Sequence, residues 1–184
     1  MKISRKSVQR ILREDLGCFP YKKIKQPKFP TKVLVWLGVC GEGLTPPVII
    51  EDRTIDAERY IDEILPIALK SDNKMLGKDW TYQQDGARPH THRFSQKWCA
   101  DHFPNFISKD RWPPNSPDLC PLDYGLWNEL AESMDWHNIQ TKANLIQEIK
   151  RSVKKIKKEN FLYSVLDFTV RLRLIQKNGG DYIR

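Results

Sequence analysis

The sequence predicts a mixed α/β fold preceded by a small basic region. Three observations lead to this prediction. The segment 32–40 (KVLVWLGVC) is a nearly continuous apolar run, 48–51 and 80–84 look like further short strands, and the segments between and after them carry apolar residues at helical spacing. Strands that alternate with helices are typical of an α/β domain. The chain has 184 residues, which is enough to bury a core.

The strands are expected in the first two thirds of the chain. The run 32–40 is rich in β-branched residues and favours a strand buried on both faces. The turn GEGLTPP leads to a second strand at 48–51. A third strand at 80–84 ends at Asp85, and a short fourth strand lies around 106–107.

Helical periodicity indicates five helices between residues 56 and 180, at 56–70, 91–103, 123–134, 141–159 and 161–180. Pro66 should kink the first of them or shorten its start. Thr91 and Thr141 are expected to cap the second and fourth helices. Phe94, Trp98 and Phe103 should lie on or near the buried side of the second helix. Four residues of the fourth helix should point inward: Leu145, Ile149, Val153 and Ile156.

The N-terminal region differs in composition from the rest. Residues 3–16 read as a short amphipathic helix whose basic residues lie away from its apolar stripe, and residues 20–31 hold three prolines and four lysines, as a linker would. A basic helix of this kind suits the reading helix of a helix-turn-helix, or simply a solvated basic helix. The change of composition therefore indicates a basic region at 1–19, a linker at 20–31 and an α/β domain at 32–184. The candidate DNA-binding residues are Arg5, Lys6, Arg10 and Arg13.

Charge and cysteine content narrow the function classes. The formal net charge is +8, which favours an acidic partner such as nucleic acid or reflects a merely soluble basic surface. No apolar stretch is long enough to span a membrane, and the N-terminus has no signal-peptide core. His90 and His92 fit a loop or helix start better than a metal pair. The cysteines, which should be reduced thiols, are not spaced as zinc ligands: Cys18, Cys40, Cys99 and Cys120.

Two carboxylates stand where an α/β fold places its sites. Asp85 follows a predicted strand, and Asp123 lies where a proline-rich loop enters a helix. Carboxylates at such positions can hold Mg²⁺, and two such ions can clamp the oxygens of a reacting phosphodiester. Position alone also allows a turn residue for Asp85 and an N-cap for Asp123.

The local motifs resemble those of the mariner branch of the Tc/mariner transposases. The segments that carry the resemblance are WTYQQDGARPHT, WPPNSPDLCPLDYGLW and RLRLIQKNGG, and KVLVWLGVCGEG is similar to the family's second core strand. Asp85 and Asp123 match the second and third catalytic aspartates, with 37 residues between them. The segment ISRKSVQRILREDLG is similar to the end of the family's DNA-binding region, so the resemblance implies a helix-turn-helix remnant at 1–19 and an incomplete catalytic domain at 32–184. The resemblance covers most of residues 32–180.

This resemblance implies a ribonuclease-H-like mixed sheet with flanking helices. It implies metal-dependent cleavage and strand transfer of transposon ends, with Asp85 and Asp123 holding Mg²⁺ or Mn²⁺. The implied partner is double-stranded DNA at the terminal inverted repeats, and the implied location is the nucleus. A homodimer is a further expectation, and no organic cofactor is expected.

One part of the family pattern is missing. The first core strand, which carries the first catalytic aspartate, has no counterpart, because KKIKQPKFPTK joins the basic helix directly to the apolar run. The only acidic residues before Lys32 are Glu14 and Asp15, both in the predicted DNA-reading helix. Asp118 and Glu129 are alternative acids, but one sits in the structural proline loop and the other lies two turns into a helix. We therefore expect weakened metal binding, lost or severely reduced activity, and an exposed strand edge.

Three other interpretations stay open. The chain is a DNA-binding remnant or domesticated transposase without catalysis, an inactive relic without a selected role, or an unrelated ribonuclease-H-like nuclease. The last would need a third carboxylate on a strand. Specific binding to a terminal repeat would separate the first from the second.

Overall fold

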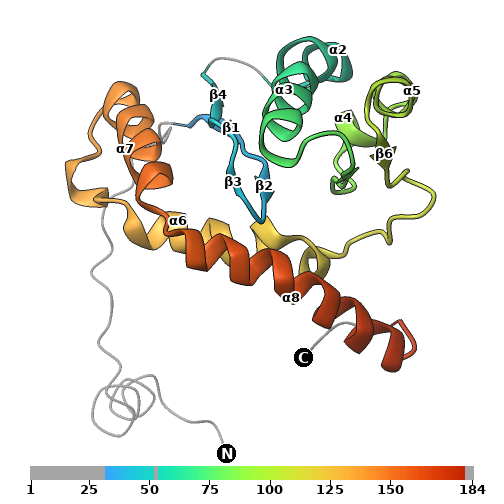
Figure 1. Ribbon diagram of the computed structural model, residues 1–184. Helices are drawn as coiled ribbons and strands as arrows, with labels where there is room; N and C mark the ends of the chain where they lie inside the picture. The colour runs from blue at the N-terminus through green and yellow to red at the C-terminus, as the bar shows by residue number, and fades with distance from the viewer. Residues whose placement is uncertain (1–31, 52–53, 181–184) are drawn as a thin grey trace, which may run out of the picture. The chain divides into compact units, whose positions relative to one another are not determined.

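The computed structural model describes residues 32–51 and 54–180, which fall within one compact unit (Figure 1). The predicted basic helix at 3–16 and the linker at 20–31 lie outside the described residues. In the described part, no helix is long and apolar enough to cross a membrane.

Six short strands form three separate two-stranded sheets. Strand β1 pairs antiparallel with β4, β2 pairs antiparallel with β3, and β5 pairs parallel with β6. The register of the first pair sets Leu34 opposite Ile50. The parallel pair joins segments on either side of helix α5 (Arg93–His102), as a crossover connection does. The strands are β1 (Leu34–Trp36), β2 (Val39–Cys40), β3 (Gly43–Leu44), β4 (Val48–Ile50), β5 (Thr81–Tyr82) and β6 (Asn105–Phe106).

The apolar run 32–40 is broken at Gly38, so it forms two strands and not the single one predicted. The Gly38 N–H donates to Thr45 Oγ1 over 2.8 Å, and the Thr45 N–H donates back to the Gly38 carbonyl over 2.9 Å. A Cβ at position 38 would lie 2.7 Å from Thr45 Cγ2. The expected burial on both faces is also wrong, because Leu34 is 44% exposed.

A cavity of 430 Å³, which we call the β1–β5 cavity, separates β1 and β2 from β5. Its lining includes every residue of 34–40 and every residue of 80–85. Since successive side chains of a strand point to opposite faces, an unbroken run of lining residues means that the cavity follows the backbone edges. Within the described residues, no strand pairing joins the two edges across it. This gap agrees with the expectation that one strand of the sheet is missing.

The helices follow the predicted order with shifted ends. The first helical segment comprises α2 (Ala57–Arg59), a π-helical turn η2 (Tyr60–Ile64) and α3 (Leu65–Leu76). The middle of the chain holds α4 (Arg88–Thr91), α5 (Arg93–His102) and the 3-10 turn η3 (Pro117–Leu119). The C-terminal third holds η4 (Leu122–Leu126, π-helical), α6 (Trp127–Ser133), the 3-10 turn η5 (Trp136–Asn138), α7 (Lys142–Lys155) and α8 (Lys158–Lys177).

Pro66 lies in the first turn of α3 and does not break the helical segment. The π-helical turn before it removes the conflict, because proline is tolerated in the first turn of a new helix. The Arg59 N–H donates to Asp56 Oδ1 over 2.9 Å and starts the segment one residue after the predicted position. The segment then runs six residues beyond the predicted end at residue 70.

Two expectations for α5 are wrong. His92 caps the helix through Nδ1, which accepts from the Phe94 N–H, whereas Thr91 ends the short α4. Phe94 is 54% exposed and not on the buried side, because α5 packs through Ser95 and Cys99, its buried residues. Trp98 and Phe103 pack against the core as expected. The Thr141 cap and the inward face of α7 are confirmed.

Two buried clusters hold the unit together. One lies between β4, the η2–α3 segment, β5 and α5, and includes Tyr60, Ile64 and Trp80. The other lies between α6, α7 and the start of α8, and includes Leu130, Ile149 and Phe161. Burial of these side chains is the main favourable term in folding. The β1–β5 cavity separates the strands that these clusters support.

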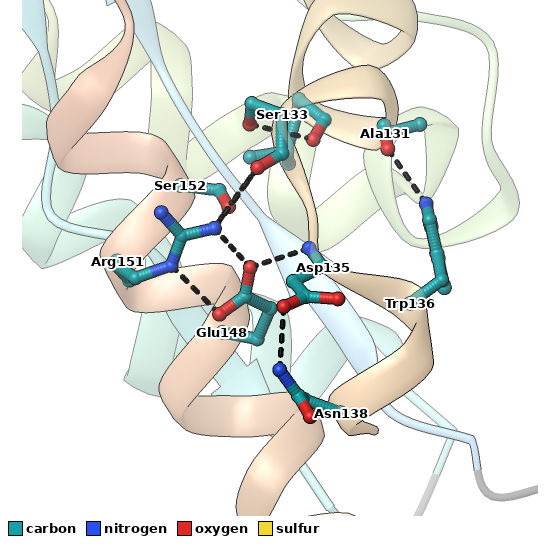
Figure 2. A network of polar contacts seen from close by, with 9 residues as sticks. Ala131, Ser133, Asp135, Trp136, Asn138, Glu148, Arg151 and Ser152 are labelled. Atoms are coloured by element: carbon teal, nitrogen blue, oxygen red, sulfur yellow. Dashed lines mark hydrogen bonds and ion pairs between the residues drawn. The ribbon is translucent and has the colours of Figure 1, made fainter.

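A polar network fixes the connection between α6 and α7 (Figure 2). Glu148 accepts from Arg151 on the same helix and from the Asp135 backbone N–H over 2.7 Å. Arg151 also donates to the Ser133 carbonyl over 2.9 Å, which satisfies the C-terminal end of α6. The arginine and the backbone N–H hold the pKa of Glu148 down, at about 2. The network therefore keeps this junction in one geometry.

Candidate functional site

The structure brings the two predicted site residues, Asp85 and Asp123, to one cavity of 570 Å³. Asp85 lies three residues after β5, and Asp123 lies in the first turn of η4. Both side chains belong to exposed residues, so the cavity is reached from solvent. Both residues also line the β1–β5 cavity, so the two cavities meet at these carboxylates. Their role as catalytic residues and metal ligands stays a prediction.

Asp85 is oriented by its own loop. Its Oδ1 lies 2.5 Å from His90 Nδ1 and accepts from the Ala87 N–H over 3.0 Å. The hydrogen bond from His90 lowers the pKa of Asp85, against a smaller opposing effect of burial. Because the carboxylate can only accept, His90 Nδ1 carries the proton in this contact. Both contacts use Oδ1, and within the described residues Oδ2 has no hydrogen-bond partner, which leaves it for a ligand.

His90 is held by buried neighbours. Its ring lies against Tyr60 with the centroids 4.4 Å apart. Its backbone carbonyl accepts from Gln84 Nε2 over 3.1 Å and from Gln96 Nε2 over 2.8 Å. Gln84 Oε1 in turn accepts from the Tyr60 hydroxyl over 2.7 Å. The buried network therefore positions His90, and His90 positions Asp85.

Asp123 is set by the turn that opens η4. Its N–H donates to the Cys120 carbonyl over 2.9 Å, so Asp123 already lies inside the turn. The N-cap residue is Pro121, and the alternative of Asp123 as an N-cap is wrong. Tyr124 anchors the turn from the other side, since its hydroxyl donates to the Ser164 carbonyl of α8 over 2.5 Å. This leaves the Asp123 side chain on the cavity side.

The remaining wall of the cavity mixes polar residues with apolar ones such as Ile107 and Trp112, and it includes one cation. Lys109 lines it, and the Lys109 backbone N–H donates to Gln96 Oε1 over 2.9 Å. Asn115, at a positive φ of 53°, and Ser116 complete the proline-rich side. Sequence reasoning missed Lys109, His90 and Gln96 as site residues. The contact of His90 with Asp85 could have been suspected from the A-R-P-H segment, which returns the chain after a tight turn, whereas Lys109 carries no local signal.

The alternative acids do not join the cavity. Glu129 accepts from Asn160 Nδ2 and so ties α6 to α8. The Asp118 carbonyl accepts from Arg171 over 3.4 Å, in line with a loop-fixing position. Neither residue lines the cavity. The four candidate DNA-binding residues, Arg5, Lys6, Arg10 and Arg13, lie outside the described residues.

The carboxylates fit one hydrated divalent ion better than two. Mg²⁺ is commonly held by one or two carboxylates and several waters, and Asp85 and Asp123 supply that number. In residues 32–51 and 54–180, no cluster of three or more His, Cys, Asp or Glu side chains could hold a metal ion. The donor set therefore does not complete a two-ion site.

The described residues have a ribonuclease-H-like α/β fold, the class to which transposase catalytic domains belong. Within that class, the fold is that of the catalytic domain of the Mos1 mariner transposase. The crystal structure of that domain superposes with a TM-score of 0.72 at 14% identity, over 100% of this chain and 98% of that one. No family model and no curated protein matches the sequence.

Structures of Mos1 in larger assemblies match equally well. The Mos1 paired-end complex with left transposon end gives a TM-score of 0.76 at 16% identity and covers 91% of this chain. The Mos1 paired-end complex with Mn gives 0.75 at 16% identity and covers 92%. The chain spans about half the length of the Mos1 chains in these complexes, 49% and 50%.

Proposed function

We propose that this chain is a transposase-derived DNA-binding protein whose phosphodiester-cleaving site keeps two of the three family carboxylates and has lost most or all of its activity. The observation that carries the proposal is the meeting of Asp85 and Asp123 on one solvent-reached cavity. The fold shared with Mos1 supports the transposase origin. The parent activity is cleavage and strand transfer of transposon ends, and the proposed location is the nucleus.

The residues on the cavity suggest how a DNA backbone would be held. Asp85 and Asp123 would share one Mg²⁺ or Mn²⁺ ion, which when bound supplies Lewis-acid polarisation of a phosphate oxygen. Lys109, on the same wall, would contact a phosphate directly. His90 would keep Asp85 aimed at the ion. A second ion would have no third carboxylate to hold it, so the attacking and leaving oxygens would not both be stabilised.

Nicking of supercoiled plasmid in Mn²⁺ tests this proposal. The purified chain is compared with Asp85→Asn and Asp123→Asn, and with Asp101→Asn as a surface control. We expect no nicking above that of the two site variants. Nicking that both site variants abolish and the control keeps would contradict the proposed loss of activity and establish an enzyme.

DNA binding is the function that remains if cleavage is absent. The net charge of +8 and the basic segment at 3–16 favour it. Changing Arg5, Lys6, Arg10 and Arg13 to Ala together should lower the slope of log K against log salt by about 3 to 4, since each phosphate contact contributes about 0.9. The matched control changes four exposed lysines of the folded unit: Lys70, Lys74, Lys78 and Lys97.

An equal loss of slope in both four-residue variants would mean that net charge alone drives binding and that residues 3–16 are no reading helix. Binding that prefers a transposon end over random duplex would further support the transposase origin. Absence of DNA binding in wild type would contradict the proposal outright.

A further inference from the structure

Helix α8 (Lys158–Lys177) is apolar on two opposite sides, and only one of them is packed. Phe161 is buried on the packed side and belongs to the second core cluster. On the other side, large apolar residues are exposed: Tyr163 by 71%, Leu166 by 60%, Val170 by 50% and Leu174 by 40%. In Figure 1 the helix runs past η4 and the β2–β3 hairpin, with which it is in contact.

The four exposed residues form one continuous stripe. Their spacing of three, four and four residues places them on a single helix face, directly opposite the packed one. A soluble helix normally turns charged residues to that side. We call Tyr163, Leu166, Val170 and Leu174 the α8 stripe. Contiguous exposed apolar surface of this kind marks an interaction site.

The ends of the α8 stripe carry opposite charges. Glu159 extends it by four residues toward the N-terminus, and Lys177 extends it by three toward the C-terminus. Both residues are exposed, and in the described part of the chain neither makes an ion pair. From its N-terminal to its C-terminal end, this face of the helix is therefore acidic, then apolar, then basic. Such a sequence of charges is complementary to itself when it is reversed.

We propose that the α8 stripe is an isologous interface on which a second copy of this chain docks its own α8 antiparallel. In that arrangement Leu166 lies opposite Val170 of the copy, Tyr163 lies opposite Leu174, and Glu159 lies opposite Lys177. The pairing is two-fold symmetric, so each contact occurs twice, as a closed dimer requires. It buries eight apolar side chains and sets two ion pairs at the rim. A parallel pairing would bring like charges together at both ends.

The apolar part of the proposal is tested by the mass of the particle in solution. Size-exclusion chromatography with light scattering of the full chain should give twice the monomer mass at tens of micromolar. Leu166→Asp should weaken the dimer at least tenfold. Leu172→Asp is the matched control, because Leu172 is 46% exposed on α8 but lies off the stripe. The control should remain dimeric, and far-UV circular dichroism should show both variants folded.

The charge part is tested by reversal. Glu159→Lys places two lysines at each end of the interface, Lys177→Glu places two glutamates there, and each should weaken the dimer. The double variant restores opposite charges across the interface and should recover dimerisation. Each native charge also suits the dipole of its own helix end, and that effect would make the double variant worse, not better. A monomeric wild-type chain, a Leu172→Asp effect equal to that of Leu166→Asp, or a double variant weaker than both single ones would overturn the proposal.

Discussion

At the scale of single residues, the site depends on how one carboxylate is held. Asp85 lies on an exposed loop, yet it is fixed by His90, which is itself held by two glutamines and a buried tyrosine. A loop ligand that is supported from the core can keep its direction without being buried. Two predictions concern carboxylates whose surroundings change their pKa.

Replacing His90 by Ala should raise the pKa of Asp85, because the hydrogen bond from His90 is the main cause that lowers it. Carboxyl ¹³C shifts followed by NMR across pH 2 to 7 would measure the change. His92→Ala is the control, since His92 contacts the start of α5 and not Asp85. An unchanged pKa of Asp85 in His90→Ala would mean that the two side chains do not interact in solution.

Replacing Asp72 by Asn should stabilise the protein above pH 6. Burial raises the pKa of Asp72 from 3.8 to about 6, so the folded state binds the extra proton between these values. Stability therefore falls as pH rises through this window, and the loss is complete above pH 6. The shift corresponds to at most about 3 kcal/mol, which partial water contact lowers to about 1 kcal/mol.

Urea unfolding at pH 4 and pH 7.5 measures this effect. The Asp72→Asn variant should be more stable than wild type at pH 7.5 and equal to it at pH 4. Asp79→Asn, at an exposed position just after α3, should have the same stability as wild type at both pH values. A variant that gains equally at both pH values would show that ionisation is not the cause.

At the scale of elements, close backbone contacts decide where strands and helices end. Sequence periodicity predicted the apolar run 32–40 but not its break, because the break depends on Thr45, which follows β3, approaching Gly38. The α5 cap also shifts by one residue, from Thr91 to His92, whose Nδ1 accepts from the Phe94 N–H. Both contacts depend on the local turn of the backbone, which hydrophobic periodicity does not encode.

Replacing Gly38 by Ala should destabilise the protein by about 1–3 kcal/mol, since a Cβ would lie 2.7 Å from Thr45 Cγ2 and the hairpin would have to move. Thermal or urea unfolding measures the loss. Gly86→Ala should stay within about 0.5 kcal/mol, because nothing lies within 4 Å of a Cβ at that position. Equal effects at both positions would contradict the tight approach at Gly38.

Replacing Glu148 by Gln should weaken the α6–α7 junction at neutral pH. Arg151 and the Asp135 N–H lower the pKa of Glu148 from 4.5 to about 2, so its stabilising effect is full above pH 4.5 and is lost as pH falls toward 2. The difference in urea midpoint between variant and wild type should therefore shrink over that range. Glu132→Gln, whose side chain accepts from Asn128 on its own helix, should show no such trend.

At the scale of the whole molecule, sequence motifs predicted the fold class and the meeting of Asp85 with Asp123. The motifs succeed because they occupy a strand end and a turn, which the fold brings together whatever the identity of the core residues. At 14% and 16% identity the core has diverged, yet the Mos1 fold is kept. The missing strand that was expected from sequence agrees with the β1–β5 cavity. Sequence could not predict the α8 stripe, because its exposure depends on which elements pack against the helix.

The β1–β5 cavity connects the incomplete sheet with the candidate site. The edges of β1 and β5 border a gap that ends at Asp85 and Asp123, so the incomplete sheet and the incomplete carboxylate set lie at the same place. A strand that filled the gap would support the carboxylates from behind. Asp85 and Asp123 line both this gap and the 570 Å³ cavity, whereas Asp72 lines the gap alone.

Asp85 and Asp123 are proposed to form a single, incomplete divalent-ion site. Mn²⁺ binding, followed by electron paramagnetic resonance, tests this most directly. The chain should bind one ion, and Asp85→Asn and Asp123→Asn should each weaken binding at least tenfold, whereas Asp101→Asn should not. Two bound ions per chain, or binding unchanged in both site variants, would contradict the claim.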